Sequence, residues 1–149
     1  MKFTLTIDPN ATEATVTVTA AVIDDDVRAI EQIASGSTRG ELRRIIGTHG
    51  SDATVIDVRT VLAFYAKDKA VWAHTTSGDY QLKQRLYEID EALPAADFVR
   101  ISQSEIVNIG AIKNLDLSLT GTISVRLVDG TRYYVSRRQL PSFKTKLGL

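Results

Sequence analysis

The stretch that decides the fold is FVRISQSEIVN, residues 98–108. Its first part, Phe98–Ile101, is apolar apart from one arginine and predicts a β-strand. The polar run Ser102-Gln103-Ser104 then interrupts the apolar pattern, which is typical of a loop. We interpret the remainder, Ser104–Asn108, as a short helical turn. The stretch is therefore expected to place a short polar loop at the end of a strand.

Upstream of this stretch, short apolar segments alternate with glycine-containing turns. Strands are predicted at residues 42–46, 54–57, 61–65, 71–75 and 79–82. Residues 83–93 predict a helix, because Leu86, Ile89 and Leu93 share one face and Pro94 follows them.

Downstream, predicted short strands and turns continue, and a predicted helix ends the chain. Residues 112–119, 122–128 and 132–135 predict strands, and Asp129-Gly130 is a two-residue hairpin signal between the last two. Ser136 is expected to cap a final helix that carries Leu140, Phe143 and Leu147 on its inner face.

The first forty residues have a different pattern. Residues 3–7 and 16–18 alternate apolar and polar side chains and predict a β-hairpin. Asp24–Asp26 begins an amphipathic helix, whose dipole favours acidic residues in its first turn; a metal site is the less favoured interpretation. Ser35-Gly36-Ser37 is the expected boundary between a segment of residues 1–38 and a domain of residues 42–149. The predicted fold is α+β, mostly β, with antiparallel sheets, short helices and this N-terminal β-hairpin and helix.

Charge is distributed unevenly along a chain whose net charge is zero. Residues 1–56 carry five Lys/Arg against eight Asp/Glu, whereas residues 98–149 carry eight against three. A basic end of this kind favours a polyanionic partner, although chance clustering is the alternative.

Several classes of protein are excluded or disfavoured by composition. The chain has no cysteine, which removes disulfides and thiolate metal sites, and it lacks a signal peptide or a membrane-spanning apolar run. We therefore expect a cytoplasmic location. His49 and His74 lie far apart, and no phosphate-binding glycine loop or serine elbow is present. No enzyme activity, cofactor, metal or small-molecule substrate is expected.

Three segments together resemble the LytTR family of bacterial DNA-binding domains. Residues 98–108 contain its Arg-x-x-x-Ser-x-x-Val-Asn pattern. Residues 127–138 are similar to the family's final hairpin and the Ser-Arg step before the last helix, and residues 61–79 to its opening hairpin. The resemblance covers residues 42–149, and the whole chain also resembles standalone regulators in which a short segment replaces the receiver domain.

The resemblance implies a transcription regulator that reads two successive major grooves of double-stranded DNA through loops. It implies a homodimer on direct repeats, with a small membrane protein as a further partner. The contact residues transferred from the family are Lys67, Lys69, Arg100, Ser102, Gln103, Ser104, Ser136, Arg137 and Arg138. Arginine and glutamine suit guanine and adenine edges, whereas lysine and serine suit phosphates. The family often has His or Arg beside the loop serine where this chain has Gln103, which leaves the base preference there open.

Alternatives remain at several of these positions. A solvated or ion-paired Arg100 is as well supported as a DNA contact, and Lys67 and Lys69 also fit a plain solvated hairpin tip. Arg137 replaces Arg138 as the base-reading residue if the family's register is shifted by one. Asn108 is expected to tie a loop to backbone atoms. The competing function is a non-enzymatic protein-interaction module whose basic C-terminal face meets an acidic partner.

Overall fold

The computed structural model describes residues 2–34 and 42–149. The chain divides into two compact units, Met1–Thr38 and Arg39–Leu149. The boundary predicted at Ser35–Ser37 lies outside the described residues.

Helix α1 (Asp25–Ala34) of the first unit begins where the acidic run predicts it. The Asp24 carboxylate accepts a hydrogen bond from the Val27 backbone N–H at 2.9 Å, which confirms the capping interpretation. Val27 and Ile30 are half-buried on one face of the helix.

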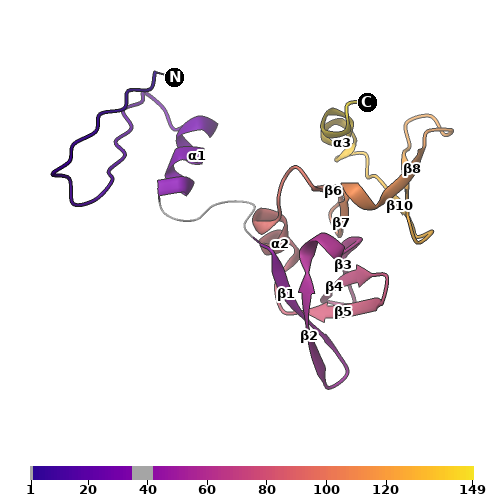
Figure 1. Ribbon diagram of the computed structural model, residues 1–149. Coiled ribbons are helices and arrows are strands. Elements are labelled where there is room, and N and C mark those ends of the chain that lie inside the picture. The colour runs from indigo at the N-terminus through magenta and orange to yellow at the C-terminus, as the bar shows by residue number, and fades with distance from the viewer. Residues whose placement is uncertain (1, 35–41) are drawn as a thin grey trace. The chain divides into compact units, whose positions relative to one another are not determined.

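The β-hairpin predicted before α1 is wrong. Residues 3–7 and 16–18 are extended, but neither forms a strand, and Figure 1 shows them as an open loop. Phe3, Leu5 and Ile7 are 83%, 70% and 77% exposed. A lone pair of strands is marginal in water because nothing covers its apolar face, so alternation alone does not produce a hairpin here.

The second unit is built on two antiparallel sheets (Figure 1). The larger has seven strands in the order β2-β1-β5-β4-β3-β7-β6, and the smaller has the order β10-β9-β8. The strands are β1 (Arg44–His49), β2 (Asp52–Asp57), β3 (Ala63–Lys67), β4 (Ala70–Thr75), β5 (Gly78–Leu82), β6 (Phe98–Ser102), β7 (Glu105–Asn108), β8 (Ile112–Asp116), β9 (Ser124–Leu127) and β10 (Arg132–Tyr134). Helices α2 (Leu86–Ala92) and α3 (Leu140–Leu147) and the 3-10 turns η1 (Val58–Thr60) and η2 (Ile109–Ala111) complete it. The predicted class, mostly antiparallel strands with short helices, is confirmed.

The second half of the deciding stretch is strand β7 and not the helical turn expected. It pairs with β6, where Val99 faces Val107, and with β3, where Phe64 faces Ile106. Hydrogen-bond partners on both sides favour the extended backbone over an isolated turn.

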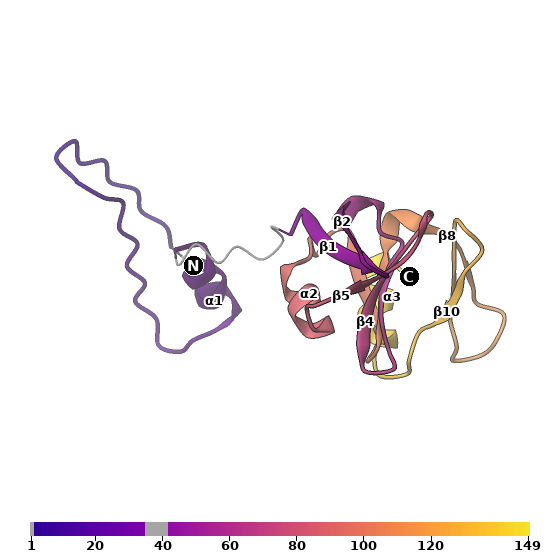
Figure 2. The ribbon, with the colours of Figure 1, turned by 90° about the horizontal axis from the view of Figure 1, so that it is seen from below.

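Neighbouring apolar residues in β6 and β7 pack into two different hydrophobic cores, one on each face of the large sheet. Phe98 and Ile106 pack with α2 on one face of the large sheet. Val99 and Val107 pack on the other face with the small sheet and Phe143 of α3. Figure 2 shows α2 and the small sheet on opposite sides of the large one. Strands buried on both faces need apolar residues at consecutive positions, which explains why this stretch lacks simple alternation.

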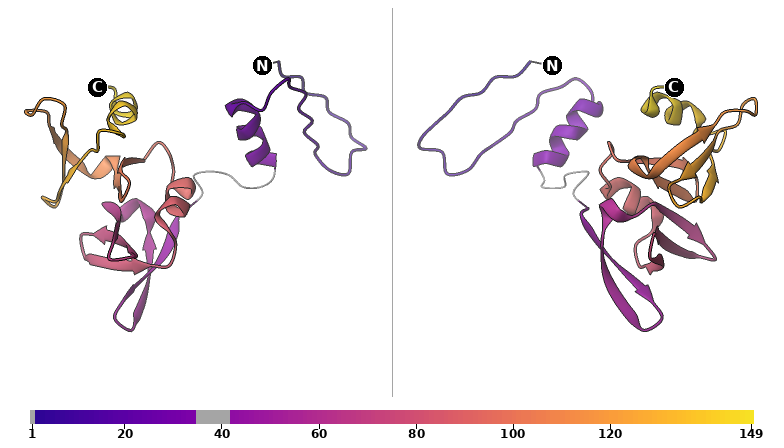
Figure 3. Two further views of the ribbon diagram at one scale, coloured as in Figure 1. Left: turned by 180° about the vertical axis from the view of Figure 1, so that it is seen from behind. Right: turned by 45° about the vertical axis from the view of Figure 1, so that its right-hand side comes forward.

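The β1–β2 hairpin extends beyond the rest of the large sheet (Figure 3). Its cross-strand partners Ile46 and Val55 are 58% and 65% exposed, whereas Ile45 and Ile56 on the opposite face are buried.

The predicted start of the last helix and the predicted end of the strand at residues 112–119 both differ from the structure by several residues. Helix α3 begins at Leu140, because Ser136 caps a turn instead: its Oγ accepts from the Gln139 N–H at 3.3 Å. Strand β8 ends at Asp116, whose carboxylate accepts from the Ser118 N–H at 2.9 Å and turns the chain. Both cases show a short polar side chain competing with regular structure.

Candidate nucleic-acid interface

The structure brings together the three segments that the sequence singled out. They are the β3–β4 tip (residues 67–69), the β6–β7 loop (residues 102–104) and the turn after β10 (residues 136–138), here called the three-loop surface. The Ala66 N–H donates to the Ser104 carbonyl at 2.8 Å, and the Ser136 N–H donates to the Ile101 carbonyl at 2.8 Å. The central loop is therefore tied to the tip on one side and to the turn on the other.

The β3–β4 tip is a tight two-residue turn. Asp68 and Lys69 have left-handed backbones, with φ of 53° and 62°, as the twist of a two-residue hairpin favours. The indole Nε1 of Trp72 donates to the Lys67 carbonyl at 3.4 Å and braces the turn. Lys67 and Lys69 are both exposed, with Asp68 between them.

Arg100 is directed into its own loop. Its Nε donates to the Ser102 carbonyl at 3.0 Å and its Nη2 to the Gln103 carbonyl at 2.5 Å. Its Nη1 lies 3.5 Å from the Asp90 carboxylate on α2, and the two side chains are 24% and 32% exposed. The geometry thus favours the ion-paired alternative for Arg100, in which the guanidinium holds the loop.

The loop has a shape set by its own side chains. The Ser102 hydroxyl donates to the Glu105 carboxylate at 2.9 Å and accepts from the Ser104 N–H at 3.2 Å. The β6–β7 register shifts between Arg100 and Ser102, and such a bulge re-aims the residues that follow it. Gln103 is left exposed at the crest of the loop.

Arg137 and Arg138 are exposed on the turn between Ser136 and Gln139. They precede helix α3 and do not occupy its first turn, so the expected cap at Ser136 does not place them there. Together with the two tip lysines, they give the three-loop surface four exposed cationic side chains. Such a set attracts a polyanion such as the DNA backbone.

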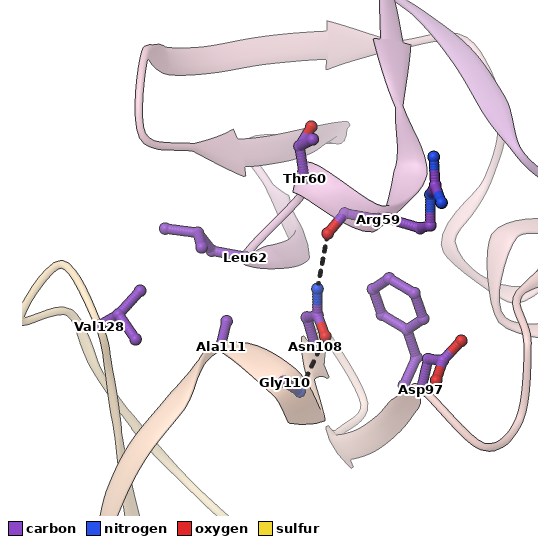
Figure 4. A pocket seen from close by; sticks show the side chains of 9 residues that line it. Arg59, Thr60, Leu62, Asp97, Asn108, Gly110, Ala111 and Val128 are labelled. Carbon is purple, nitrogen blue, oxygen red and sulfur yellow. Dashed lines mark hydrogen bonds between the residues drawn. The ribbon is translucent and has the colours of Figure 1, made fainter.

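A separate hollow of about 430 Å³, whose lining Figure 4 shows, includes Phe98 at the start of β6. The polar loop follows the other end of that strand, at Ser102. Asn108 crosses the floor of the hollow, donating to the Val61 carbonyl at 2.9 Å and the Arg59 carbonyl at 3.2 Å and accepting from the Gly110 N–H at 3.0 Å. This confirms that Asn108 ties a loop to backbone atoms. The Arg59 guanidinium is paired with Asp57 at 2.9 Å.

The described part of the chain contains no cluster of three or more His, Asp or Glu side chains arranged to hold a metal. Among its helices, none combines the length and the apolar character needed to cross a membrane.

The sequence did not point to two residues that support the three-loop surface, Asp90 and Trp72. Asp90 reaches Arg100 from helix α2, and Trp72 reaches Lys67 across the hairpin. No local spacing signals either contact, because both depend on elements packing together.

Comparison with known proteins identifies the family. The LytTr DNA-binding domain family matches residues 51–148. Uncharacterized HTH-type transcriptional regulators of Staphylococcus aureus strains NCTC 8325 and N315 are each 36% identical over 149 residues, which is 100% of this chain and 99% of each relative. A solved LytTr DNA-binding domain from Bacillus cereus has a TM-score of 0.69 at 24% identity and shares the fold over 72% of this chain and 98% of that one. The chain therefore belongs to the LytTR family, a family of DNA-binding domains and not of enzymes.

Proposed function

We propose that this protein is a transcription regulator that recognises a specific DNA sequence through its three-loop surface. The observation that carries the proposal is the meeting of three sequence-distant loops with exposed cations at both outer segments, joined by the Ala66–Ser104 and Ser136–Ile101 hydrogen bonds. Each loop is held by a β-ladder or a side-chain contact, which preorganises it for a ligand. Acting on DNA, the protein would work in the cytoplasm.

We assign the exposed side chains to base edges or to phosphates according to their chemistry. Arg138, with Arg137 as the alternative, is assigned to a guanine edge, and Gln103 to an adenine edge. Lys67 and Lys69 are assigned to phosphates, with Ser102, Ser104 and Ser136 supplying neutral donors where their hydroxyls are not already used. Arg100 supports the central loop from inside and is assigned a positioning role.

We assign base recognition to the loops and not to a recognition helix. The Staphylococcus relatives carry the description HTH-type. Among the described residues, however, no two helices follow one another directly: α1 precedes β1, α2 precedes β6 and α3 follows β10. A helix-turn-helix needs two successive helices joined by a short turn.

The first unit is assigned to self-association, giving a homodimer that binds direct repeats. Support comes from its exposed apolar side chains, among them Phe3, Val16 and Ile23 at 83%, 63% and 71% exposure. Apolar groups in such numbers on a short segment favour contact with another surface. A small membrane protein is the second candidate for that contact, and it would regulate the protein by sequestration.

Selection of bound sequences from a random duplex library tests the proposal. We expect two short motifs whose centres lie about 10 bp apart, the repeat of the major groove on one side of the duplex. Lowering salt should strengthen binding: the two lysine–phosphate contacts assigned to each domain contribute about −1.8 to the slope of log K against log salt.

A matched control is the Lys67→Ala/Lys69→Ala double variant, which should lower that slope by about 2 without changing the selected motifs. Binding without any sequence preference, together with tight binding of an acidic protein, would instead support the interaction-module alternative.

A further inference from the structure

His74 forms a bridge between the two sheets of the second unit. From β4, its Nδ1 lies 2.5 Å from the Asp79 carboxylate at the start of β5. Its Nε2 lies 2.5 Å from the Asp129 carboxylate and 3.1 Å from the Thr131 hydroxyl, both on the β9–β10 turn of the small sheet. The imidazole is only 18% exposed, so one half-buried side chain holds a hairpin of one sheet to a turn of the other.

The geometry requires a proton on each ring nitrogen. Ionised carboxylates only accept hydrogen bonds, and a neutral imidazole has a single N–H donor. Both carboxylate contacts are therefore satisfied together only by the imidazolium. Burial by itself lowers the pKa of His74, but the hydrogen bonds and charges of Asp79 and Asp129 outweigh it and raise that pKa above 6.5.

The groups that face this bridge are acidic or phenolic. The Tyr65 hydroxyl of β3 donates to the Asp79 carboxylate at 2.5 Å, and burial together with that carboxylate raises the pKa of Tyr65 to about 12. Burial, then the charge of Glu105 on β7, raises the pKa of Tyr133 on β10. Both phenols thus stay neutral near neutral pH, and the imidazolium lies among carboxylates that favour its charge.

We propose that His74 is a positioning residue for DNA binding, which holds the β9–β10 turn against the large sheet and so fixes the path of the chain toward Arg137 and Arg138. Four residues separate Thr131 from Ser136, and they form one rigid connection, because β10 pairs with β9 and the Val135 N–H donates to the Ile123 carbonyl at 2.9 Å before the Ser136 N–H donates to the Ile101 carbonyl. A turn that shifts at Asp129 therefore shifts β10 and the two arginines after it. The inference rests on the proposed function of the three-loop surface.

The pH range of the bridge follows from two shifts of opposite direction. Because the pKa of His74 is raised in the folded protein, its contribution to the free energy of unfolding is fully present below pH 6.5. That contribution is lost as the pH rises through the pKa of His74 in the folded state. Burial raises the pKa of Asp129, but hydrogen bonds from Thr131 and His74 leave it below 3.8. The Asp129 contribution is thus present above pH 3.8 and is lost only as pH falls through the lowered value.

The bridge itself is testable by NMR on the full chain without DNA. His49, exposed on β1, and His74 are the two histidines, so both imidazoles can be followed in one titration. We expect the His74 midpoint above 6.5, with N–H signals from both ring nitrogens below it. Asp129→Asn should lower that midpoint and leave the His49 signal unmoved. A midpoint at or below 6.5, or one that Asp129→Asn does not change, would overturn the bridge.

The positioning role is tested by measuring DNA affinity at one pH below and one pH above the midpoint of the His74 titration. Wild type and the control His49→Gln should lose about threefold to tenfold in affinity for the selected duplex as the bridge breaks, the range expected for one hydrogen bond. His74→Gln and Asp129→Asn should bind weakly at both pH values, with a smaller step. If His74→Gln unfolds, Asp129→Asn still tests the role. Asparagine has the same shape as aspartate, and the Asp129 side chain is 24% exposed, so this change is tolerated more easily.

Three outcomes are informative. A pH step of equal size in wild type and both bridge variants would overturn the positioning role. Unchanged affinity in variants whose NMR spectra show a broken bridge would do the same. Failure of wild type to bind any sequence specifically would overturn the proposed function, and the positioning role with it, while the NMR titration still decides whether the bridge exists.

Discussion

Replacing Arg100 by methionine separates a residue that shapes the DNA-reading loop from one that touches DNA. Methionine keeps the aliphatic stem and removes the guanidinium. The change therefore deletes the hydrogen bonds to the Ser102 and Gln103 carbonyls and the ion pair with Asp90.

The expected loss of stability follows from those contacts. Hydrogen bonds to a charged group contribute about 1.5–3 kcal/mol when buried. Here Gln103 is exposed and the Arg100 side chain is 24% exposed, so water replaces part of what is lost. Asp90 is also left without its partner, at 32% exposure. We expect the free energy of unfolding to fall by about 1–2 kcal/mol for the two hydrogen bonds and the ion pair together.

Urea unfolding of the full chain measures this as a lower midpoint at unchanged slope. The matched control is Arg137→Met, an exposed arginine on the same surface, for which we expect a change within about 0.5 kcal/mol. Arg100→Lys should not restore stability, because an ammonium cannot reproduce the fork that spans two carbonyls.

DNA selection then completes the test. A loosened loop should lower affinity for the selected duplex and, together with the fall in stability, weaken the preference at the bases that the loop reads. If Arg100→Met unfolds at the same urea concentration as wild type and relaxes one base position only, Arg100 is a direct contact and the reasoning from its hydrogen bonds fails.

Three further predictions concern other parts of the molecule. Arg138→Ala should cost about 1–3 kcal/mol of specific affinity and relax one base position, as a base-selection profile would reveal; a profile that changes only in Arg137→Ala would move the role to that residue. Asn108→Ala should lower the free energy of unfolding by about 1–3 kcal/mol, because two carbonyls and an N–H lose their partner; an unchanged urea midpoint would contradict this. A chain starting near residue 40 should bind DNA more weakly and sediment as a monomer; undiminished dimerisation would remove the assigned role of the first unit.

Elements whose signal is local were predictable from sequence. Leu86 and Ile89 of α2 and Leu93, which caps its C-terminus, are buried on one face, at 6%, 1% and 1% exposure, as their spacing indicates. The Asp129-Gly130 turn also lies where turn chemistry places it, between β9 and β10. In each case neighbouring residues alone set the backbone preference.

Predictions failed where a distant partner decides the conformation. Residues 104–108 look ambiguous in isolation, yet they are extended because β3 and β6 both pair with them. Residues 3–7 have the alternation of a strand and form none: no strand is present among the described residues of their unit, and their apolar side chains stay exposed.

The sequence by itself determined the family, the three candidate loops and the basic character of the C-terminal third, since residue identity and spacing carry all of these. Only the tertiary structure decided what each polar group does. It turned Arg100 inward to Asp90 and the loop carbonyls, left Arg137 and Arg138 exposed, and placed His74 between Asp79 and Asp129. The reason is physical: a charged side chain takes its role from the donors, acceptors and burial around it, and here those come from segments as far apart as 55 residues.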